Sequence, residues 1–199
     1  MKKIISRIAM ALVVLFAMGS LTSCNYNSLV EQEQAVDQAW AQVENQYQRR
    51  ADLIPNLVNT VKGYAEHENE TYVKVTEARS GLSQAYNAAE AIQNPQQNIQ
   101  AYQEAQSNLK GALDIYVNAV REAYPDLKAN ENFNNLQAQL EGTENRISTE
   151  RERYTQAVKE YNTAIHKFPT MIYAGWFGFK DKEQFKAEAG AAKAPKVEF

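Results

Sequence analysis

The chain has 199 residues, a formal net charge of −3 and a single cysteine, Cys24. This mildly acidic balance argues against a nucleic-acid partner, which requires a basic stripe or patch. One cysteine excludes a disulfide within the chain and a cysteine-based metal site, so stability has to come from packing. The length is sufficient for one domain with a substantial core.

The N-terminal segment has the pattern of a bacterial lipoprotein signal peptide. Three basic residues precede an apolar run at 8–21, and the run leads into Leu21-Thr22-Ser23-Cys24, which resembles a lipobox. The run is shorter than the stretch of about 20 apolar residues that crosses a bilayer. A short run behind positive charges and before small residues is typical of a cleaved export signal. We therefore predict cleavage before Cys24 and attachment of fatty acyl chains such as palmitate to that residue.

An uncleaved membrane helix with an incidental cysteine is the alternative interpretation of this segment. The short run and the position of Cys24 favour lipidation. Both interpretations tether the body of the protein to a membrane of the bacterial cell envelope, facing the periplasm. Loss of residues 1–23 removes three basic residues and no acidic one, which changes the formal net charge from −3 to −6.

The rest of the chain has helical spacing almost throughout, with apolar residues recurring at steps of three, four and seven. Asn94-Pro95, Tyr124-Pro125 and Pro169 separate the segments, because Asn and Pro favour helix starts and the residue before Pro avoids helical angles. A single helix over 26–92 would be about 100 Å long and would leave half of its apolar stripe uncovered. We therefore place a break at 67–70. The predicted helices lie near 26–67, 70–92, 96–124 and 130–168.

Short connections between successive helices imply antiparallel neighbours. The sequence thus predicts an all-α fold, an antiparallel up-and-down four-helix bundle with coiled-coil-like packing, after an N-terminal lipoprotein signal peptide. The predicted organisation is a signal peptide at 1–23, a helical bundle ending in an aromatic strap at 24–180, and a polar, flexible tail at 181–199.

Several sequence blocks resemble the LemA family. They are, in chain order, Tyr47–Val58, Thr60–Tyr64, Glu131–Phe133 with Leu136-Gln137, Thr143–Ile147, Tyr161-Asn162 and Phe168-Pro169. The resemblance covers nearly all of the chain after Cys24, and implies an up-and-down four-helix domain without an established biochemical activity. It also implies an envelope protein partner, with TPM-domain proteins as the candidate, because members often occur beside them. Many relatives have a retained membrane helix where this chain has a lipobox.

Charged residues interrupt the apolar stripes of the first and last predicted helices. Heptad steps from Leu29 through Val36 and Val43 place Arg50 at a core-facing position, and Glu144 interrupts the last helix in the same way. Antiparallel alignment of the two helices brings Arg50 to the level of Glu144.

We predict a buried or half-buried polar layer that pairs Arg50 with Glu144 and includes Asp52, Arg146 and Arg151. Such a layer fixes helix register more than it adds net stability, because desolvation offsets the attraction of a buried ion pair. A polar pocket for a small ligand is the alternative.

Catalytic and metal signatures do not accompany this layer. His67 lacks the second histidine that a zinc-protease motif needs four residues later, where the chain has Thr71. His166 lies near a predicted helix end, where a cation suits the helix dipole. The sequence contains no nucleophile elbow and no glycine-rich phosphate loop. We therefore expect no catalytic residue, no cofactor, no metal and a protein that is not an enzyme.

An aromatic segment with two glycines follows Phe168-Pro169 and contains Trp176, Phe177 and Phe179. We favour a strap that covers one end of the bundle, and an exposed Trp176 would contradict that interpretation. The alternative is a patch for a partner protein or for the membrane interface, where Trp and Tyr are favoured.

Two functions follow from these features. The first is a non-catalytic scaffold or adaptor that is anchored through Cys24 and binds another envelope protein through a helical face. The second is a ligand-binding protein or enzyme that uses Arg50, Asp52 and Glu144. A closed polar layer favours the adaptor, whereas an open pocket lined by these side chains favours the ligand-binding protein.

Overall fold

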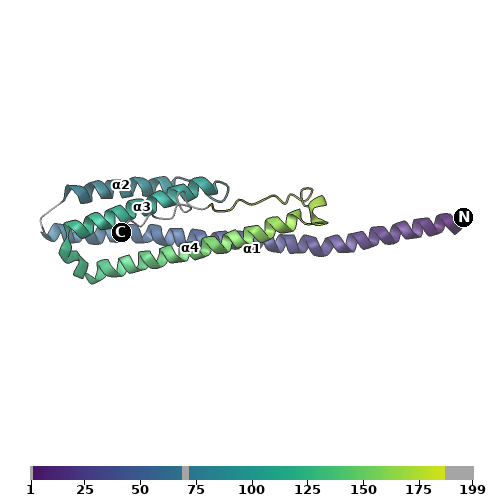
Figure 1. The fold of residues 1–199 in the computed structure, drawn as a ribbon, viewed down its shortest axis with the longest axis horizontal. Helices are drawn as coiled ribbons and strands as arrows, with labels where there is room; N and C mark the ends of the chain where they lie inside the picture. Colours follow the sequence, from purple (N-terminus) through teal and green to yellow (C-terminus); the bar gives the residue numbers. More distant parts are fainter. Residues whose placement is uncertain (1, 69–71, 187–199) are drawn as a thin grey trace, which may run out of the picture. The chain divides into compact units, whose positions relative to one another are not determined.

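The computed structural model describes residues 2–68 and 72–186, with side chains at 26–66 and 72–186. Over these ranges the chain is helical and contains no strand. Its elements are α1 (Lys2–Glu68), α2 (Val73–Glu90), α3 (Ile99–Ala123), the 3-10 helix η1 (Pro125–Ala129), α4 (Glu131–His166) and the 3-10 helix η2 (Thr170–Ile172) (Figure 1). The predicted lipobox lies on α1, outside the residues whose side chains are described.

The predicted break after the first long helix is confirmed, because α1 ends at Glu68 and α2 begins at Val73. Aromatic packing holds the two sides of this break. The buried ring of Tyr124 lies edge-to-face with Tyr64 of α1, at 5.9 Å between centroids, and with Tyr72 before α2, at 5.3 Å. The ring of Tyr124 therefore contacts an aromatic residue on each side of the break.

Two predicted helix starts differ from the structure. α1 begins at Lys2 rather than near residue 26, so the helix includes the predicted signal segment. α3 begins at Ile99, because Asn94 has a φ of 51°, the left-handed conformation that Asn tolerates, and not the extended backbone of an N-cap. The Asn94 carbonyl accepts a hydrogen bond from the Gln97 N–H at 2.9 Å, which makes this stretch a turn.

The start of α4 agrees with its prediction. The side-chain Oδ1 of Asn130 accepts a hydrogen bond from the Phe133 N–H at 3.1 Å, and Glu131 is the first helical residue. This bond satisfies one of the backbone donors that a helix N-terminus leaves free.

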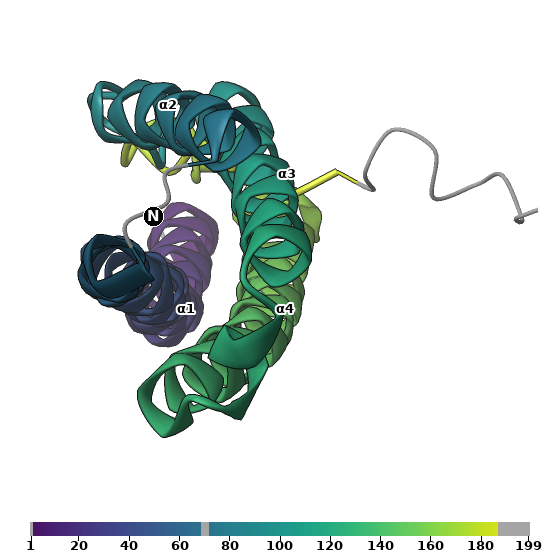
Figure 2. The ribbon, with the colours of Figure 1, turned by 90° about the vertical axis from the view of Figure 1, so that its left-hand side faces the viewer.

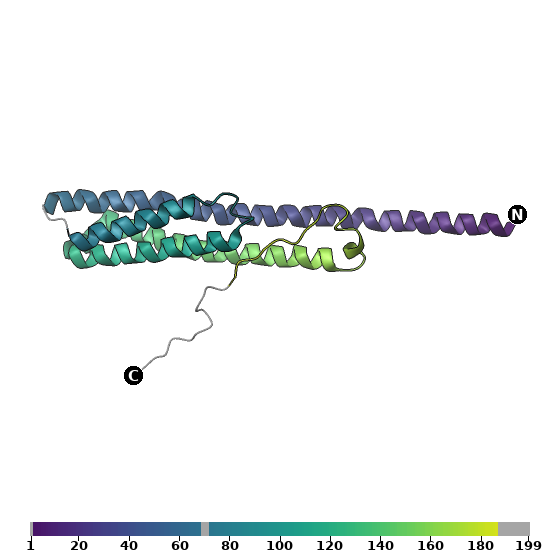
Figure 3. The same cartoon turned by 90° about the horizontal axis from the view of Figure 1, so that it is seen from above.

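The described chain divides into two compact units, each containing part of α1 and part of α4. The first unit comprises Met1–Ala41 and Arg153–Lys182. In it, α1 and α4 lie side by side (Figure 3), and the buried Trp40 packs edge-to-face on Tyr154 with 5.3 Å between centroids. Among the residues searched for membrane spans, those with described side chains, no helix is long and apolar enough to cross a bilayer.

The second unit comprises Gln42–Glu152 and Glu183–Phe199, and parts of all four α-helices and of η1 contribute to its core. Figure 2 looks along these helices and shows α2 packed along α3. The apolar spacing that predicted each helix accounts for its buried side, since one face of every helix supplies the core. Core residues include Leu57, Val61, Leu82, Leu113, Tyr116, Val120, Leu127, Phe133 and Leu140.

Candidate functional site

Arg50 is the centre of the predicted polar layer, and it is only 2% exposed. It lies on α1 between the buried Val43 and Leu57, where the heptad phase placed it. Its Nη1 donates a hydrogen bond to Glu144 Oε1 of α4 at 2.7 Å. Its Nη2 donates to the backbone carbonyl of Gln106 on α3 at 3.2 Å and to the side-chain oxygen of the same residue. Arg50 therefore links three helices of the second unit.

The surroundings of the guanidinium keep it away from solvent. Arg50 Cζ lies 5.2 Å from the ring centroid of Tyr47, within cation–π range. Glu144, with a side chain 24% exposed, is the more accessible member of the ion pair. Because the more deeply buried partner is the cation, the layer depends on Glu144 to balance a charge that water cannot reach.

Asp52 and Arg146 do not belong to this layer, which corrects the sequence-based prediction. Both side chains are exposed, and Asp52 instead accepts a hydrogen bond from Gln48 Nε2 at 2.9 Å on the surface of α1. Each lies two residues after a layer member, and two residues correspond to a rotation of about 200° around a helix. They therefore face away from the core.

Arg151 is half-buried but is also separate from the layer. It follows Glu144 by one heptad, about 10 Å along the axis of α4. Its Cζ lies 4.7 Å from the ring centroid of Phe185, in the C-terminal segment. Arg151 thus packs on Phe185 and is not part of the Arg50 layer.

Gln106 is the layer member that the sequence analysis missed. It is buried, and it lies on the apolar stripe of α3 between Tyr102 and Leu109. A polar side chain at the spacing of buried positions was the available signal, the same one that identified Arg50. An uncharged amide at such a position is a weaker sequence signal than a charge. Even so, both the side-chain oxygen and the backbone oxygen of Gln106 accept hydrogen bonds from the buried Arg50 cation.

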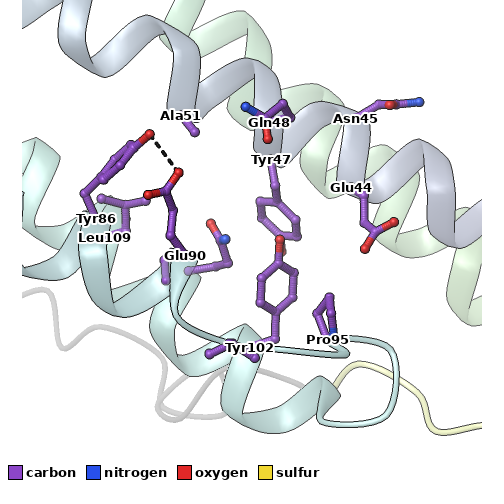
Figure 4. Close-up of a pocket in the computed structure, with 13 residues that line it drawn as sticks. Glu44, Asn45, Tyr47, Gln48, Ala51, Tyr86, Glu90, Pro95, Tyr102 and Leu109 are labelled. Carbon is purple, nitrogen blue, oxygen red and sulfur yellow. Dashed lines mark hydrogen bonds between the residues drawn. The ribbon is translucent and has the colours of Figure 1, made fainter.

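A cavity of about 610 Å³ lies beside the layer, with walls from α1, α2 and α3 (Figure 4). The rings of Tyr47 and Tyr102 meet edge-to-face in it, with 5.3 Å between centroids. Tyr86 Oη donates to Glu90 Oε1 at 3.1 Å, and Glu44 supplies a second carboxylate. Burial raises the pKa of Tyr102 to about 12, so this phenol stays protonated at physiological pH.

The cavity is not lined by Arg50, Asp52 or Glu144. Glu144 instead borders a different cavity of about 580 Å³ between α3 and α4. Within the described residues, the three side chains proposed to form a ligand pocket therefore share no cavity. Arg50 itself lines neither of these two cavities, whereas its layer partners Gln106 and Glu144 each border one of them.

The aromatic segment is covered in part. Phe179 is 8% exposed and lies edge-to-face with Tyr26 of α1, at 5.6 Å between centroids. Gly178 makes this possible by adopting a φ of 86°, a backbone conformation that is unfavourable for residues with a side chain. The Phe179 N–H then donates a hydrogen bond back to the Ala174 carbonyl at 3.1 Å. Trp176 and Phe177 are 84% and 61% exposed. The strap interpretation is therefore wrong for these two residues.

The start of the predicted flexible tail is held by two side-chain amides. In the first unit, Asn162 Nδ2 donates to the Lys182 carbonyl at 2.9 Å, and the Lys182 N–H donates back to Asn162 Oδ1 at 3.0 Å. In the second unit, Gln103 makes the same pair of bonds with Lys186, at 2.7 and 3.1 Å. Residues 182–186 thus have a hydrogen-bonded residue at each end, and 187–199 lie outside the described residues.

No group of three or more metal-ligating side chains occurs in the part of the chain whose side chains are described, which includes His166. His166 Nε2 lies 2.9 Å from Asp181 Oδ1 on the surface. The side chain of His67 lies outside the described residues.

One known protein family matches the part of the chain that contains Arg50 and its partners. The model of the LemA family matches residues 39–199, a stretch that includes the three members of the layer and the aromatic segment. The chain belongs to the LemA family. The resemblance inferred from Tyr47–Val58 and the later blocks is thereby confirmed.

Relatives of this LemA-family chain come from several bacteria. Protein LemA of Metamycoplasma hominis is 27% identical over 153 residues, covering 75% of this chain and 60% of that protein. Magnetosome protein MamQ 2 of Paramagnetospirillum magneticum is 26% identical over 176 residues, covering 81% and 64%. Magnetosome protein MamQ of Magnetospirillum gryphiswaldense is 24% identical over 192 residues, covering 89% and 71%. The chain thus spans about three-fifths of the length of the first two relatives.

Proposed function

We propose that this LemA-family chain is a lipoprotein of the bacterial cell envelope, anchored through fatty acyl chains on Cys24 and facing the periplasm. The short apolar run before Leu21-Thr22-Ser23-Cys24 supports a cleaved signal at 1–23. The relatives named as magnetosome proteins support association with a membrane. Each buried CH₂ contributes about 0.8 kcal/mol to anchoring, so more than one acyl chain holds a protein stably.

The anchored domain acts, in this proposal, as a non-catalytic scaffold or adaptor for another envelope protein, with a TPM-domain protein as the candidate partner. The observation that carries the adaptor role is the enclosure of Arg50, which is 2% exposed. Arg50 uses its hydrogen bonds to join α1, α3 and α4, and it does not line the neighbouring cavity. We further propose that α1, α2, α3 and α4 form an antiparallel up-and-down four-helix bundle, which the short connections between them support. The exposed helical faces are then the functional surface.

Ligand binding is the second candidate function, and the cavity of Figure 4 is the observation that favours it. Its tyrosine rings and the carboxylates of Glu44 and Glu90 suit a ligand that carries both a positive charge and an apolar part. This role would not use Arg50, Asp52 or Glu144 as a pocket.

Photo-crosslinking in intact cells tests the adaptor role. Ile115 on α3 is 64% exposed and borders a shallow hollow formed with the small residues Ala78, Gly81 and Ala112. A photoreactive residue in place of Ile115 is expected to capture a reproducible partner protein. The same residue in place of the exposed Ala138 on α4 is the matched control and should capture less. Absence of any reproducible product from either site, in a folded and membrane-associated protein, would contradict the adaptor role.

A further inference from the structure

The segment after α4 carries most of the exposed large hydrophobic side chains in the described part of the chain. Of nine exposed large hydrophobic side chains there, five lie at positions 168–177 and a sixth is Tyr26. The five are Phe168, Met171, Ile172, Trp176 and Phe177. Solitary exposed hydrophobic residues need no explanation, but a concentration of them marks an interaction site. We call residues 168–179 together with Tyr26 the aromatic end.

The aromatic end is a folded structure. Tyr26 on α1 lies edge-to-face with Phe177, at 5.2 Å between centroids, and with Phe179, at 5.6 Å. Tyr173 is buried and packs against Phe177 at 6.1 Å. In Figure 3 this segment forms a compact coil beyond the end of α4 and beside α1. Phe177 is therefore held by ring contacts with Tyr26 and with the buried Tyr173, while Phe177 and Trp176 remain open to solvent.

The position of Tyr26 connects the aromatic end to the membrane attachment. Tyr26 follows Cys24 by two residues, which span at most about 7 Å even in a fully extended chain. A lipid on Cys24 is thus attached within about 7 Å of the Tyr26 backbone, and Tyr26 in turn contacts the rings of Phe177 and Phe179. A retained helix over residues 8–21 would enter the membrane beside the same point.

The charges around the aromatic end suit a phospholipid surface. Lys167 and Lys180 are exposed and flank the segment, and residues 168–179 contain no acidic side chain. Asp181 lies 2.9 Å from His166 and is thereby partnered, and Lys182 pairs with Glu33 at 3.0 Å. Cationic side chains near a bilayer attract anionic headgroups, and Trp and Tyr favour the interface between headgroups and acyl chains.

We propose that the aromatic end is a second membrane contact, which rests Trp176 and Phe177 in the interfacial layer of the bilayer that holds the Cys24 anchor. The proposal rests on the proposed anchoring, because attachment at Cys24 brings this surface to the lipid. An apolar contact of this kind supplements acyl chains, since stable attachment commonly combines two signals. It also fixes which end of the first unit meets the membrane.

Tryptophan fluorescence of the full-length protein in vesicles tests this contact. The chain has two tryptophans, Trp40 and Trp176, so Trp40→Phe leaves Trp176 as the emitter, and Trp176→Phe leaves the buried Trp40 as the matched control. The probe is a vesicle of phosphatidylethanolamine and phosphatidylglycerol, with or without brominated acyl chains. We expect Trp176 emission to shift to shorter wavelength and to lose intensity with brominated lipid, whereas Trp40 emission stays unchanged.

Charge and folding controls complete the test. Lys167→Glu with Lys180→Glu should reduce the Trp176 shift on these anionic vesicles without releasing the protein from them. If Trp40→Phe disturbs folding, 5-fluorotryptophan in the unsubstituted chain gives separate ¹⁹F signals for the two residues and the same comparison.

Flotation of the vesicles separates the two proposals. A protein that floats with vesicles while Trp176 remains fully accessible to an aqueous quencher would overturn the aromatic contact and leave the anchor intact. A protein that fails to float would overturn the anchor and the contact that depends on it. Shielding of Trp176 without lipid, increasing with protein concentration, would overturn the lipid contact in favour of a second copy of the chain.

Discussion

Replacement of Glu144 by leucine is expected to lower the free energy of unfolding by about 3 kcal/mol, because it leaves the Arg50 cation buried without its counter-charge. Arg50 keeps only the two Gln106 oxygens as acceptors in that variant. Replacement of Arg50 by methionine should reduce stability less, by about 1 kcal/mol. Methionine fills a similar volume, and Glu144, with a side chain 24% exposed, can be hydrated when its partner is lost.

The double variant Arg50→Met/Glu144→Leu tests whether Arg50 and Glu144 stabilise the protein as a coupled pair or independently of each other. The double variant should lose roughly 2 kcal/mol less unfolding free energy than the sum of the two single losses, since no unpaired charge remains. Urea unfolding followed by circular dichroism measures all three variants. Asp52→Asn is the matched surface control and should change stability by less than about 0.5 kcal/mol. Additive single effects, or a larger loss from Arg50→Met than from Glu144→Leu, would contradict this account of the layer.

The sequence predicted the position of Arg50 because a helix repeats its buried face every seven residues. The positions from Leu29 through Val36, Val43 and Arg50 to Leu57 are all buried, as this repeat requires. The same repeat argues against Asp52 and Arg146, which were grouped with the layer by closeness in sequence rather than by helical phase. Residues that are close in sequence need not share a helix face, because side chains two residues apart point to nearly opposite sides of the helix.

Features that depend on backbone turns could not be predicted in this way. Composition marks the segment after Phe168 as apolar, but it does not say which rings are covered. The left-handed conformation of Gly178 turns Phe179 inward and leaves Trp176 exposed. Asn94 likewise takes a left-handed conformation and makes a turn where an N-cap was predicted. The amide bonds from Asn162 and Gln103 join residues distant in sequence, which no local pattern signals.

Substitution of Cys24 by alanine is expected to abolish processing of the N-terminal segment. Lipid attachment requires the Cys24 thiol, and cleavage of a lipoprotein signal follows that attachment in the proposed scheme. The variant should therefore accumulate with residues 1–23 still attached, whereas the unsubstituted chain is shortened. Immunoblotting of whole cells measures the difference in length.

Ser23→Ala is the control for this substitution, because it keeps a small residue before the cleavage site and keeps the thiol. It should be processed like the unsubstituted chain. Processing of Cys24→Ala at the normal rate and position would show that cleavage does not depend on lipid, and the segment would then be an ordinary export signal.

The mass of the N-terminal peptide, released from protein purified out of the membrane, tests the proposed anchor most directly. We predict a peptide that begins at Cys24 and carries the added mass of fatty acyl chains on that residue. A peptide that still contains residues 1–23 with an unmodified Cys24 would contradict lipidation. It would assign the tether to a retained apolar helix instead.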